Sequence, residues 1–547
     1  MATLRMVFAT LSLDNVFKAV YLVFKIIQNI RNLITYNTIN EKKFINTSLR
    51  WVIIFLFVMV GLQNANGQVS VDTDPGNLEI VNSPGDSLQN RILFLENIEI
   101  KGNKKTKKRI ITREIDLQTN VSYTFKELRE LIKLDENKIF NTGLFNSVKA
   151  ELEFAENSEN SVNVIFFVEE RWYIWPSVIF KLADRNFSDW LFNQNAATDR
   201  FEYGFKFDQF NVRGLNERLS AMAQFGFKRR FYFGYNIPYL NKDQTFGMGL
   251  SFSFSELDQI DYTNVENKRL FISADSIFGD DNERQIISNT LTSNVFFNYR
   301  ESFYNTHTLR LTYSRTTILE EVLQFNEDYL GSNRDLEQDY FGLTYIFRRD
   351  FRDRNNYPLK GFLIDGRLSK IGLGIFNDIN QGSAEALVAY YKPLKHNFNI
   401  ASSLTGYTSY PRFQPYNNMQ GLGFANNLLK GYELYVIQGQ HYIMNKMELK
   451  KRIFSIEANL GRLMPLKQFR KVPIAAYFKV FFDQGYVQNN LPESSRTTVN
   501  SILSNRYIYS YGAGLDIVTY YDAVLRLEYS INALNEAGFF INVKSGI

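Results

Sequence analysis

The sequence has no cysteine and only three histidines among its 547 residues. The absence of cysteine excludes disulfides, thiol nucleophiles, cysteine-bound metals and a lipid-modified N-terminal cysteine. The histidines, His307, His396 and His441, are not spaced as metal ligands, and no Gly-x-Ser-x-Gly nucleophile elbow is present. We therefore expect no enzyme, no metal and no cofactor. The net charge of +5 is small for this length and gives no indication of a nucleic-acid partner.

A concentrated apolar run, Trp51–Leu62, follows basic residues and precedes a segment with small residues before Gln68. Its roughly twelve residues are too few to span a bilayer, which needs about twenty. The small residues suit cleavage by an export peptidase. We therefore predict an N-terminal extension and signal peptide over residues 1–67. The long leader is explained by a start codon placed too far upstream or by a true cytoplasmic extension, and a buried core element is the alternative for the apolar run.

A small α+β domain is predicted over residues 91–171, after a linker over residues 68–90 that contains two Pro-Gly breakers. The order of its elements is β-α-α-β-β, because apolar residues recur at helical spacing in two segments and alternate in the others. The expected elements are a strand over Ile92–Asn103, helices over Thr106–Ile115 and Thr124–Asn141, and strands over Phe145–Phe154 and Ser161–Glu170.

Beyond Trp172, apolar and polar residues alternate with period two. Leu250 and Phe252, for example, alternate with Ser251 and Ser253. About sixteen such segments follow one another with no helical pattern between them. Aromatic residues make up 15% of the chain, which suits a protein that exposes rings to something other than water. A soluble β-sandwich also alternates, but its apolar face is a finite core between two sheets.

The lengths of the links between these segments favour a barrel. Links after even-numbered segments are mostly short, the link after the twelfth being a long exception, and links after odd-numbered segments are mostly long. Short turns at one rim and long loops at the other are typical of an outer-membrane β-barrel with an even number of strands. We predict a mainly β fold, with a transmembrane antiparallel β-barrel of about 16 strands over residues 172–547. The long links are residues 257–286, 318–337, 410–440 and 485–505.

Five short motifs follow one another along the chain. The most distinctive is Lys430-Gly431-Tyr432, which follows a run rich in glycine and asparagine and precedes Asn445 and Glu448 on the next strand. No catalytic chemistry has this form. The other motifs are Asn211-Val212-Arg213-Gly214 with a following Pro238-Tyr239; Asp350, Arg352 and Asp353 with Pro358 and Gly361; Phe482, Asp483 and Gly485; and Gly512 with Gly514.

Three of the motifs also have an ordinary explanation. Gly512-x-Gly514 lacks the third glycine and the strand-to-helix context of a nucleotide fingerprint. The charged residues around Asp353 could form a solvated turn, and Lys430 could be an exposed loop lysine. The Gly431-Tyr432 pair and the charged strand faces nearby argue against the last reading, because a long loop over a lumen can bury a cation where a carboxylate faces it.

Taken in order, the five motifs resemble the BamA/TamA-type outer-membrane assembly superfamily, the bacterial surface-antigen proteins. Residues 91–171 resemble one POTRA module of that family, and the likeness covers nearly all of the chain from Ile92 onward. The resemblance implies that loop 410–440 folds back into the barrel lumen. At the tip of the loop the chain departs from the family, because Lys430 stands where the family has arginine.

The resemblance also implies a partner for the loop tip. The family's Phe-x-Asp-x-Gly strand points its aspartate inward, so we expect Lys430 to pair with Asp483. Parity supports this, because Lys479, Phe481 and Asp483 share one face of their strand. Lysine cannot form the planar two-bond fork of arginine, so we expect a looser contact than the family norm.

By resemblance, the protein is an assembly or insertion factor of the bacterial outer membrane, with its POTRA-like domain in the periplasm. Its implied partners are membrane lipid, unfolded outer-membrane client proteins and periplasmic or lipoprotein accessory subunits. The family's lateral gate would lie between the first and last strands, where Pro176 removes a ladder donor and Gly538 and Gly546 weaken pairing. The chain ends on Ile547 and not on an aromatic residue.

Three other functions remain open. A secretion pore for one partner polypeptide would commonly carry two POTRA modules and a plug helix, whereas one module and no clear plug are visible. A passive porin would need neither the POTRA-like module nor the loop motif. An outer-membrane lipase or protease would need a histidine beside a serine or aspartate, and His396 is the only candidate.

Overall fold

The fold is described by a computed structural model of the protein, in which residues 68–547 form one compact unit. The predicted signal peptide and extension, residues 1–67, lie outside the described residues. No helix in the described part of the chain is long and apolar enough to cross a membrane. The structure describes residues 79–81, 91–155, 158, 160–183, 190–191, 195–279, 285–331, 333–376, 378–424, 427–459, 471–491, 498–519 and 523–544.

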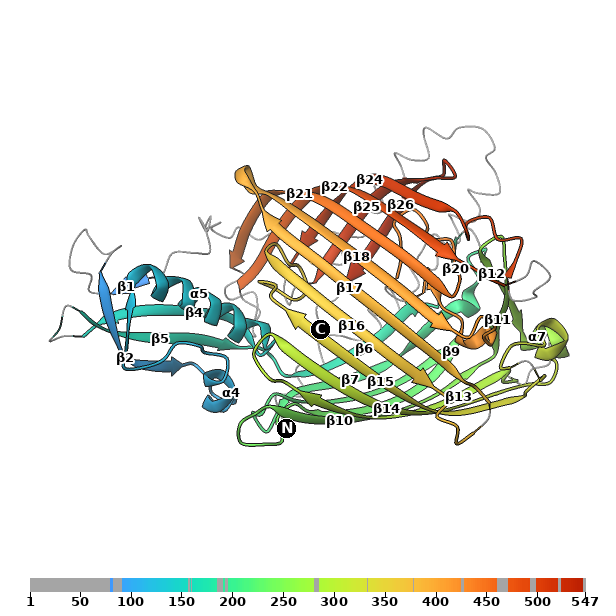
Figure 1. Cartoon of the computed structure of the whole chain (residues 1–547), viewed down its shortest axis with the longest axis horizontal. Coiled ribbons are helices and arrows are strands. Elements are labelled where there is room, and N and C mark those ends of the chain that lie inside the picture. Colours follow the sequence, from blue (N-terminus) through green and yellow to red (C-terminus); the bar gives the residue numbers. More distant parts are fainter. Residues whose placement is uncertain are drawn as a thin grey trace, which may run out of the picture. The chain divides into compact units, whose positions relative to one another are not determined.

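The N-terminal domain is a five-stranded sheet in the order β1-β4-β5-β2-β3, with helices α4 and α5 (Figure 1). Thr124 caps α5 and forms a capping box with Glu127, and the apolar face of the helix, including Leu128 and Ile132, is buried in the domain core. The five predicted elements are present in the predicted order, with two further short strands among them. The elements are β1 (Glu79–Val81), β2 (Ile92–Lys101), α4 (Lys108–Thr112), β3 (Val121–Thr124), α5 (Phe125–Asn141), β4 (Phe145–Phe154) and β5 (Ser161–Glu170).

Two strands of this sheet were not predicted. Within the segment predicted as a linker, Glu79–Val81 form β1, which pairs in parallel with Glu151–Glu153 of β4. Between the helices, Val121–Thr124 form β3, which pairs with the start of β2. Both strands are short, so the alternation of their side chains is too brief to be seen in the sequence.

The rest of the chain forms an antiparallel sheet of 16 strands, running from β6 to β26, that curls into a barrel (Figure 1). The predicted number and order of strands are confirmed, with β21 and β22 longer than predicted. The strands are β6 (Ile174–Leu182), β7 (Phe201–Val212), β8 (Glu217–Gly226), β9 (Lys228–Ile237), β10 (Phe246–Leu257), β13 (Ser288–Tyr299), β14 (Asn305–Ile318), β15 (Glu337–Asp350), β16 (Gly361–Ile371), β17 (Gln381–Pro393), β18 (Phe398–Tyr410), β21 (His441–Asn459), β22 (Lys471–Gln488), β24 (Tyr507–Val518), β25 (Val524–Asn532) and β26 (Ala537–Lys544).

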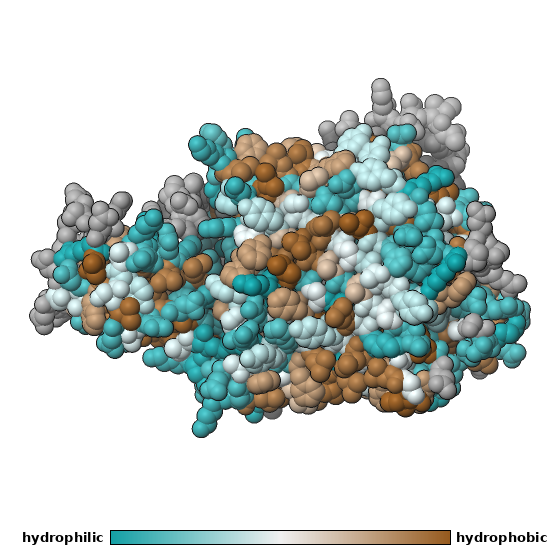
Figure 2. All heavy atoms as spheres, viewed as in Figure 1, coloured by the Kyte–Doolittle hydropathy of each residue, from teal (hydrophilic) through white to brown (hydrophobic). Residues whose placement is uncertain are grey.

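The outer face of the barrel is apolar. Leu250 and Phe252 are 41% and 45% exposed, and they alternate with serines on the inner face. Figure 2 shows hydrophobic residues gathered over the barrel strands. Exposed apolar bands of this kind suit contact with lipid. The alternation of apolar and polar residues that predicted the strands therefore corresponds to side chains on the outer and inner faces of a transmembrane barrel.

At one rim, the long links fold into a connected cover. Asn267 accepts hydrogen bonds from the backbone N–H groups of Ile502 and Leu503, both at 2.9 Å, and its own carbonyl accepts one from the N–H of Val436 at 2.8 Å. Three links far apart in sequence therefore meet at one asparagine. The elements in all the long links of this rim are η1 (Thr198–Arg200), β11 (Gln259–Val265), β12 (Lys268–Ser273), α7 (Ala274–Phe278), α8 (Val322–Phe325), η3 (Tyr416–Asn418), β19 (Gly421–Leu422), β20 (Ile437–Gln438) and β23 (Thr498–Val499).

At the other rim, the short turns contact the N-terminal domain. Buried Glu114 accepts two hydrogen bonds from the guanidinium of Arg300, at 2.8 and 3.0 Å. Asn211 donates through Nδ2 to the hydroxyl of Thr106 at 2.8 Å, and Gly214 accepts from the Lys107 N–H at 3.0 Å. The Asn-x-x-Gly turn therefore serves to seat the domain. Another short turn of this rim, between β17 and β18, contains the 3-10 helix η2 (Lys395–Asn397), which includes His396.

Gly214 is required at this junction for two physical reasons. Its φ is +75°, a conformation that other residues adopt only with strain. A Cβ atom at this position would lie 2.2 Å from the backbone oxygen of Lys105. The glycine of the motif thus lets the barrel turn and the N-terminal domain approach at backbone distance.

Candidate functional site

The loop over residues 410–440 folds into the barrel and its tip lies against the wall formed by β22, β24 and β25. Tyr432 is buried, donates its hydroxyl hydrogen to the backbone oxygen of Tyr509 at 2.9 Å and accepts from the N–H of Ala533 at 3.0 Å. Asn532 donates to the backbone oxygen of Gly431 at 2.9 Å. These bonds hold the tip close to the turn that joins the last two strands.

Lys430 at the loop tip is placed between two carboxylates. Its Nζ atom lies 3.4 Å from Asp483 Oδ2, the predicted partner, and 2.8 Å from Glu448 Oε1. Its backbone N–H also donates to Asp483, at 3.3 Å, and the ammonium lies 4.7 Å from the centre of the Phe481 ring. The shorter ion pair is therefore with Glu448, which sequence reasoning grouped with the supporting motif and not with the tip contact.

The pKa of Lys430 reflects these neighbours. Burial alone lowers the pKa of this lysine, but the charges of Glu448 and Asp483 more than offset the loss of water, so its pKa lies above the ordinary value. Lys430 therefore carries its charge at every physiological pH. A compact ammonium can reach both carboxylates from one point, and this is the geometry that replaces the arginine fork here.

Four glycines make room for this arrangement. Gly431 has φ +80°, and a Cβ there would lie 3.3 Å from side-chain atoms of Ser510 and Ser530 on the wall. A Cβ on Gly485 would lie 3.0 Å from Leu429 of the loop. On β24, a Cβ on Gly512 would lie 2.6 Å from the Phe481 ring, and one on Gly514 would lie 3.2 Å from Lys479. The predicted glycine motifs thus leave space for the loop and for the inward side chains of β22.

A second charged cluster continues from the first. Lys479 is completely buried and lies 2.7 Å from Asp516 and 2.6 Å from Glu528. It also lies 3.8 Å from Glu448, whose other oxygen pairs with Lys450 at 2.8 Å. Sequence reasoning placed Lys479 on the inward face but gave it no role. The signal available was an inward lysine beside inward carboxylates on β24 and β25.

The other predicted site residues shape the turns and strands around the cluster. Asp350 forms an ion pair with Arg352, whose Nε lies 2.7 Å from its carboxylate. Asn445 donates to the backbone oxygen of Ser403 at 3.1 Å, so it joins strands and does not contact the loop tip. Phe482 packs on Tyr509 from the opposite face of β22. Pro358 and Gly361 close the turn before β16, and Gly361 has φ +105°.

The two ends of the sheet are β6 and β26, and no pairing between them is present in the described residues. Pro176 of β6 faces Phe207 of β7, and Gly538 of β26 faces Ser530 of β25. Gly546 lies outside the described residues. Each terminal strand is thus paired on one side only in the described part of the chain.

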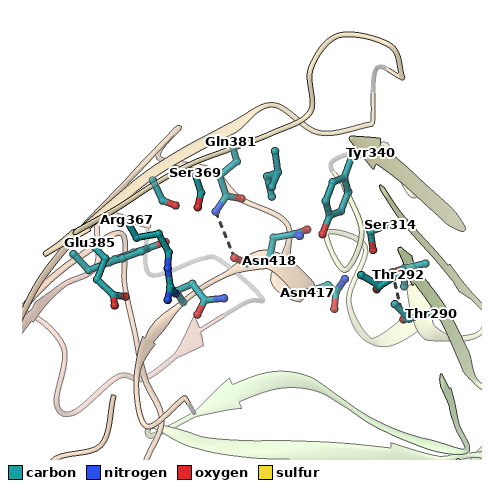
Figure 3. A pocket seen from close by; sticks show the side chains of 15 residues that line it. Thr290, Thr292, Ser314, Tyr340, Arg367, Ser369, Gln381, Glu385, Asn417 and Asn418 are labelled. Atoms are coloured by element: carbon teal, nitrogen blue, oxygen red, sulfur yellow. Dashed lines mark hydrogen bonds between the residues drawn. The ribbon is translucent and has the colours of Figure 1, made fainter. Parts of the chain in front are cut away.

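The lumen away from the loop tip contains a cavity of about 460 Å³. Its lining is mainly hydroxyl and amide side chains that point inward from β13 to β18, with Arg367 and Glu385 as its charged residues (Figure 3). The lining also includes Asn417 and Asn418 of the folded-back loop. Such a wall is compatible with water and with a polar polypeptide.

Comparison with known proteins identifies the family. The sequence model of the Omp85 superfamily domain matches residues 211–538, more than half of the chain. The chain belongs to the Omp85 superfamily. A POTRA model, described as the surface antigen variable number repeat, matches residues 94–171. The resemblance inferred from the motifs and the predicted POTRA module are thereby confirmed.

Three solved structures are similar to this Omp85 chain at low sequence identity. BamA from Haemophilus ducreyi lacking POTRA domains 1-3 is 16% identical, with a TM-score of 0.44 over 82% of this chain and 83% of that chain. CdiB from Escherichia coli is 12% identical, with a TM-score of 0.48 over 83% and 75%. CdiB from Acinetobacter baumannii is 14% identical, with a TM-score of 0.43 over 82% and 74%. No curated protein matches the chain.

Membership of the Omp85 superfamily implies a general role and a location. Omp85 proteins insert or translocate client proteins at the outer membrane, with their POTRA domains in the periplasm. The family therefore implies a periplasmic side for the rim of short turns, which carries the POTRA domain, and an extracellular side for the rim of long links.

Replacing either carboxylate around Lys430 should release the loop tip. Trypsin cleaves after lysine, so the Lys430–Gly431 bond is itself the reporter, and cleavage can be measured by mass in the detergent-solubilised protein. We expect Asp483→Asn to raise cleavage about fivefold and Glu448→Gln to raise it more, because charge-assisted contacts are about twice as strong as neutral ones. Asp243→Asn, in the exposed turn before β10, is the control. Wild-type cleavage in both lumenal variants would show that these carboxylates do not hold the loop.

Docking of the loop should weaken as pH rises. Glu433 is 1% exposed, and burial raises its pKa to about 8 from an ordinary value of 4.5. Between these values the docked loop binds more protons than the released loop, so the released population grows by up to about tenfold per pH unit. We expect cleavage at Lys430 to rise between about pH 6 and pH 8 relative to the Glu433→Gln variant. Parallel pH profiles in the two proteins would contradict the assignment.

Proposed function

We propose that this Omp85 protein inserts client β-barrel or surface proteins into the outer membrane through an opening between β6 and β26. The observation that supports this most directly is that these strands end the sheet and are each paired on one side only in the described residues. Pro176 removes a donor from β6, and Gly538 leaves β26 with less side-chain packing. A seam of this kind is easier to open than any internal strand pair.

The insertion step follows from the need to keep every backbone N–H and C=O group hydrogen-bonded in lipid. In lipid, each unpaired backbone group costs several kcal/mol, so a client strand must pair as it enters. The free edge of β6 can supply these bonds by strand addition, and the client then leaves sideways into lipid. No step requires a catalytic group or a cofactor. Membrane lipid and unfolded clients are the partners, with periplasmic accessory subunits acting at the POTRA domain.

The POTRA domain offers part of a sheet edge for such contacts. β4 lies at one side of the sheet, and β1 covers only its last part, at Glu151–Glu153. From Ser147 to Lys149, β4 has no second strand on its outer side in the described residues, and we place strand addition by an extended client or accessory segment there.

Translocation of one partner polypeptide is the second candidate. The polar cavity between β13 and β18 supports it, because hydroxyl and amide groups can exchange hydrogen bonds with a passing backbone. A passive porin is supported less, because the loop tip fills one side of the lumen and Asn267 ties three links together above it.

Depletion of the protein, followed by quantitative proteomics of the outer membrane, tests these functions. A broad fall in barrel proteins is the result expected of a general insertion factor. Loss of one protein or one small class would identify a dedicated translocator. An unchanged outer-membrane proteome would overturn both proposals and favour the porin.

A further inference from the structure

The turn between β15 and β16, residues 351–360, is here called the inner turn. It is built as a rigid unit around Asp353, whose Oδ1 atom accepts hydrogen bonds from the N–H groups of Leu359 at 3.0 Å and Lys360 at 3.2 Å. Backbone bonds close its base, where Phe351 donates to Phe362 at 2.8 Å. A turn held by this many bonds moves as one body.

One side of the inner turn reaches into the lumen through Tyr357. This residue is 4% exposed, and its hydroxyl donates to Asp516 Oδ2 at 2.9 Å. Its ring lies 5.0 Å from the ring of Tyr477, and the ammonium of Lys450 lies 4.5 Å from its centre. A residue of a periplasmic turn is thus part of the buried charged cluster.

The cluster continues from Tyr357 to the loop tip. Asp516 contacts Lys479 at 2.7 Å, Lys479 lies 3.8 Å from Glu448, and Glu448 contacts Lys430 at 2.8 Å. These four ionisable side chains are largely removed from bulk water, so the position of each depends on its neighbours more strongly than it would at a surface.

The other side of the inner turn contacts the POTRA domain. Asn141, the last residue of α5, donates through Nδ2 to the backbone oxygen of Asp353 at 3.1 Å. The guanidinium of Arg354 lies 4.9 Å from the centre of the Phe140 ring, also on α5. The inner turn therefore touches the end of a POTRA helix on one side and the lumenal cluster on the other.

We propose that Tyr357 is a positioning residue through which the inner turn couples POTRA helix α5 to the loop tip. The hydroxyl of Tyr357 donates a hydrogen bond to Asp516, and Asp516 forms an ion pair with Lys479. Lys479 and Lys430 both lie within ion-pair distance of Glu448. When a ligand of the POTRA domain moves α5 and with it the inner turn, the ion pairs that fix Lys430 at the loop tip change strength. The inference deepens the proposed insertion function, since it gives an occupied POTRA domain a physical route to the loop inside the barrel.

The first test compares two matched substitutions in the full chain. Tyr357→Phe removes the hydroxyl that donates to Asp516 and keeps the ring. Tyr477→Phe removes the hydroxyl of the neighbouring ring, which faces Asp516 across the β22–β24 pair but forms no hydrogen bond with its carboxylate among the described residues. We expect Tyr357→Phe to raise tryptic cleavage at Lys430–Gly431 about fivefold, as loss of a hydrogen bond to a buried charge implies. Tyr477→Phe should leave it unchanged. Unchanged cleavage in Tyr357→Phe, or an equal rise in both variants, overturns the proposal.

The second test separates coupling from local loosening. Asn141→Ala removes the bond between α5 and the inner turn and should raise cleavage at Lys430 in the wild-type background. In the Tyr357→Phe background it should add nothing, because the route is already broken. No effect of Asn141→Ala alone, or additive effects in the double variant, overturns the coupling. No client takes part in either test, so the outcome is independent of whether the insertion function holds.

Discussion

Replacing Lys479 with alanine lowers the free energy of unfolding by about 3–5 kcal/mol, the loss expected when one partner of a buried ion pair is removed. Asp516 and Glu528 would remain buried without their common cation, from which they lie 2.7 and 2.6 Å in the native protein. The measurement is a urea titration of the protein refolded in lipid vesicles. Lys395→Ala, in an exposed periplasmic turn, is the control and should change stability by less than about 0.5 kcal/mol.

A triple variant shows whether charge or volume causes this loss. In Lys479→Met with Asp516→Asn and Glu528→Gln, the shape of the cluster is kept, and the two carboxylates closest to Lys479 lose their charge together with it. Buried ion pairs replaced as a whole are often neutral in stability, so the triple variant should recover most of the loss seen with Lys479→Met alone. Equal instability of the single and triple variants would mean that packing, and not charge, is what Lys479 supplies.

Joining β6 to β26 by a disulfide should abolish client insertion and leave the barrel folded. The chain has no cysteine, so an introduced pair forms the only possible disulfide. A scan of pairs along Ile174–Leu182 and Ala537–Lys544 finds those that cross-link under oxidation. Insertion of an eight-stranded outer-membrane barrel into vesicles should fall by more than about tenfold when the seam is closed, because the client can no longer reach the free strand edge.

The matched control is a disulfide between strands that are already paired. Tyr529 of β25 faces Phe539 of β26, so cysteines at these two positions cross-link without closing the seam. This variant should keep its activity in both redox states, and the seam variants should regain theirs on reduction. Full activity of an oxidised seam variant would exclude the lateral opening.

Much of the fold is readable from local features of the sequence. Alternation such as Leu250, Ser251, Phe252 marks a strand with one lipid face, because side chains of a strand point to opposite sides in turn. Link lengths separate the two rims, and the capping signal of Thr124 and Glu127 marks the start of α5. The same parity placed Lys479, Phe481 and Asp483 inside the barrel. Each of these features depends on residues close together in the chain.

The contacts of the site depend on which strands become neighbours. Glu448 and Asp483 both reach Lys430 because β21 lies beside β22 and the loop tip lies against the lumenal side of these strands, a placement that no local pattern encodes. The role of Lys479 required two further strands to bring Asp516 and Glu528 to it. A motif therefore indicates that a residue faces inward, but not which partner it meets.

The sequence by itself determined the strands, their inward and outward faces and the family motifs, since these follow from alternation, turn chemistry and spacing. Only the tertiary structure decided that Tyr357 of a periplasmic turn reaches Asp516 and that Asn267 joins three extracellular links. These contacts join residues that are more than 150 positions apart, as with the 159 positions between Tyr357 and Asp516. They exist only because the curling of the 16-stranded sheet brings distant strands and turns to one lumen, where buried charges must find partners.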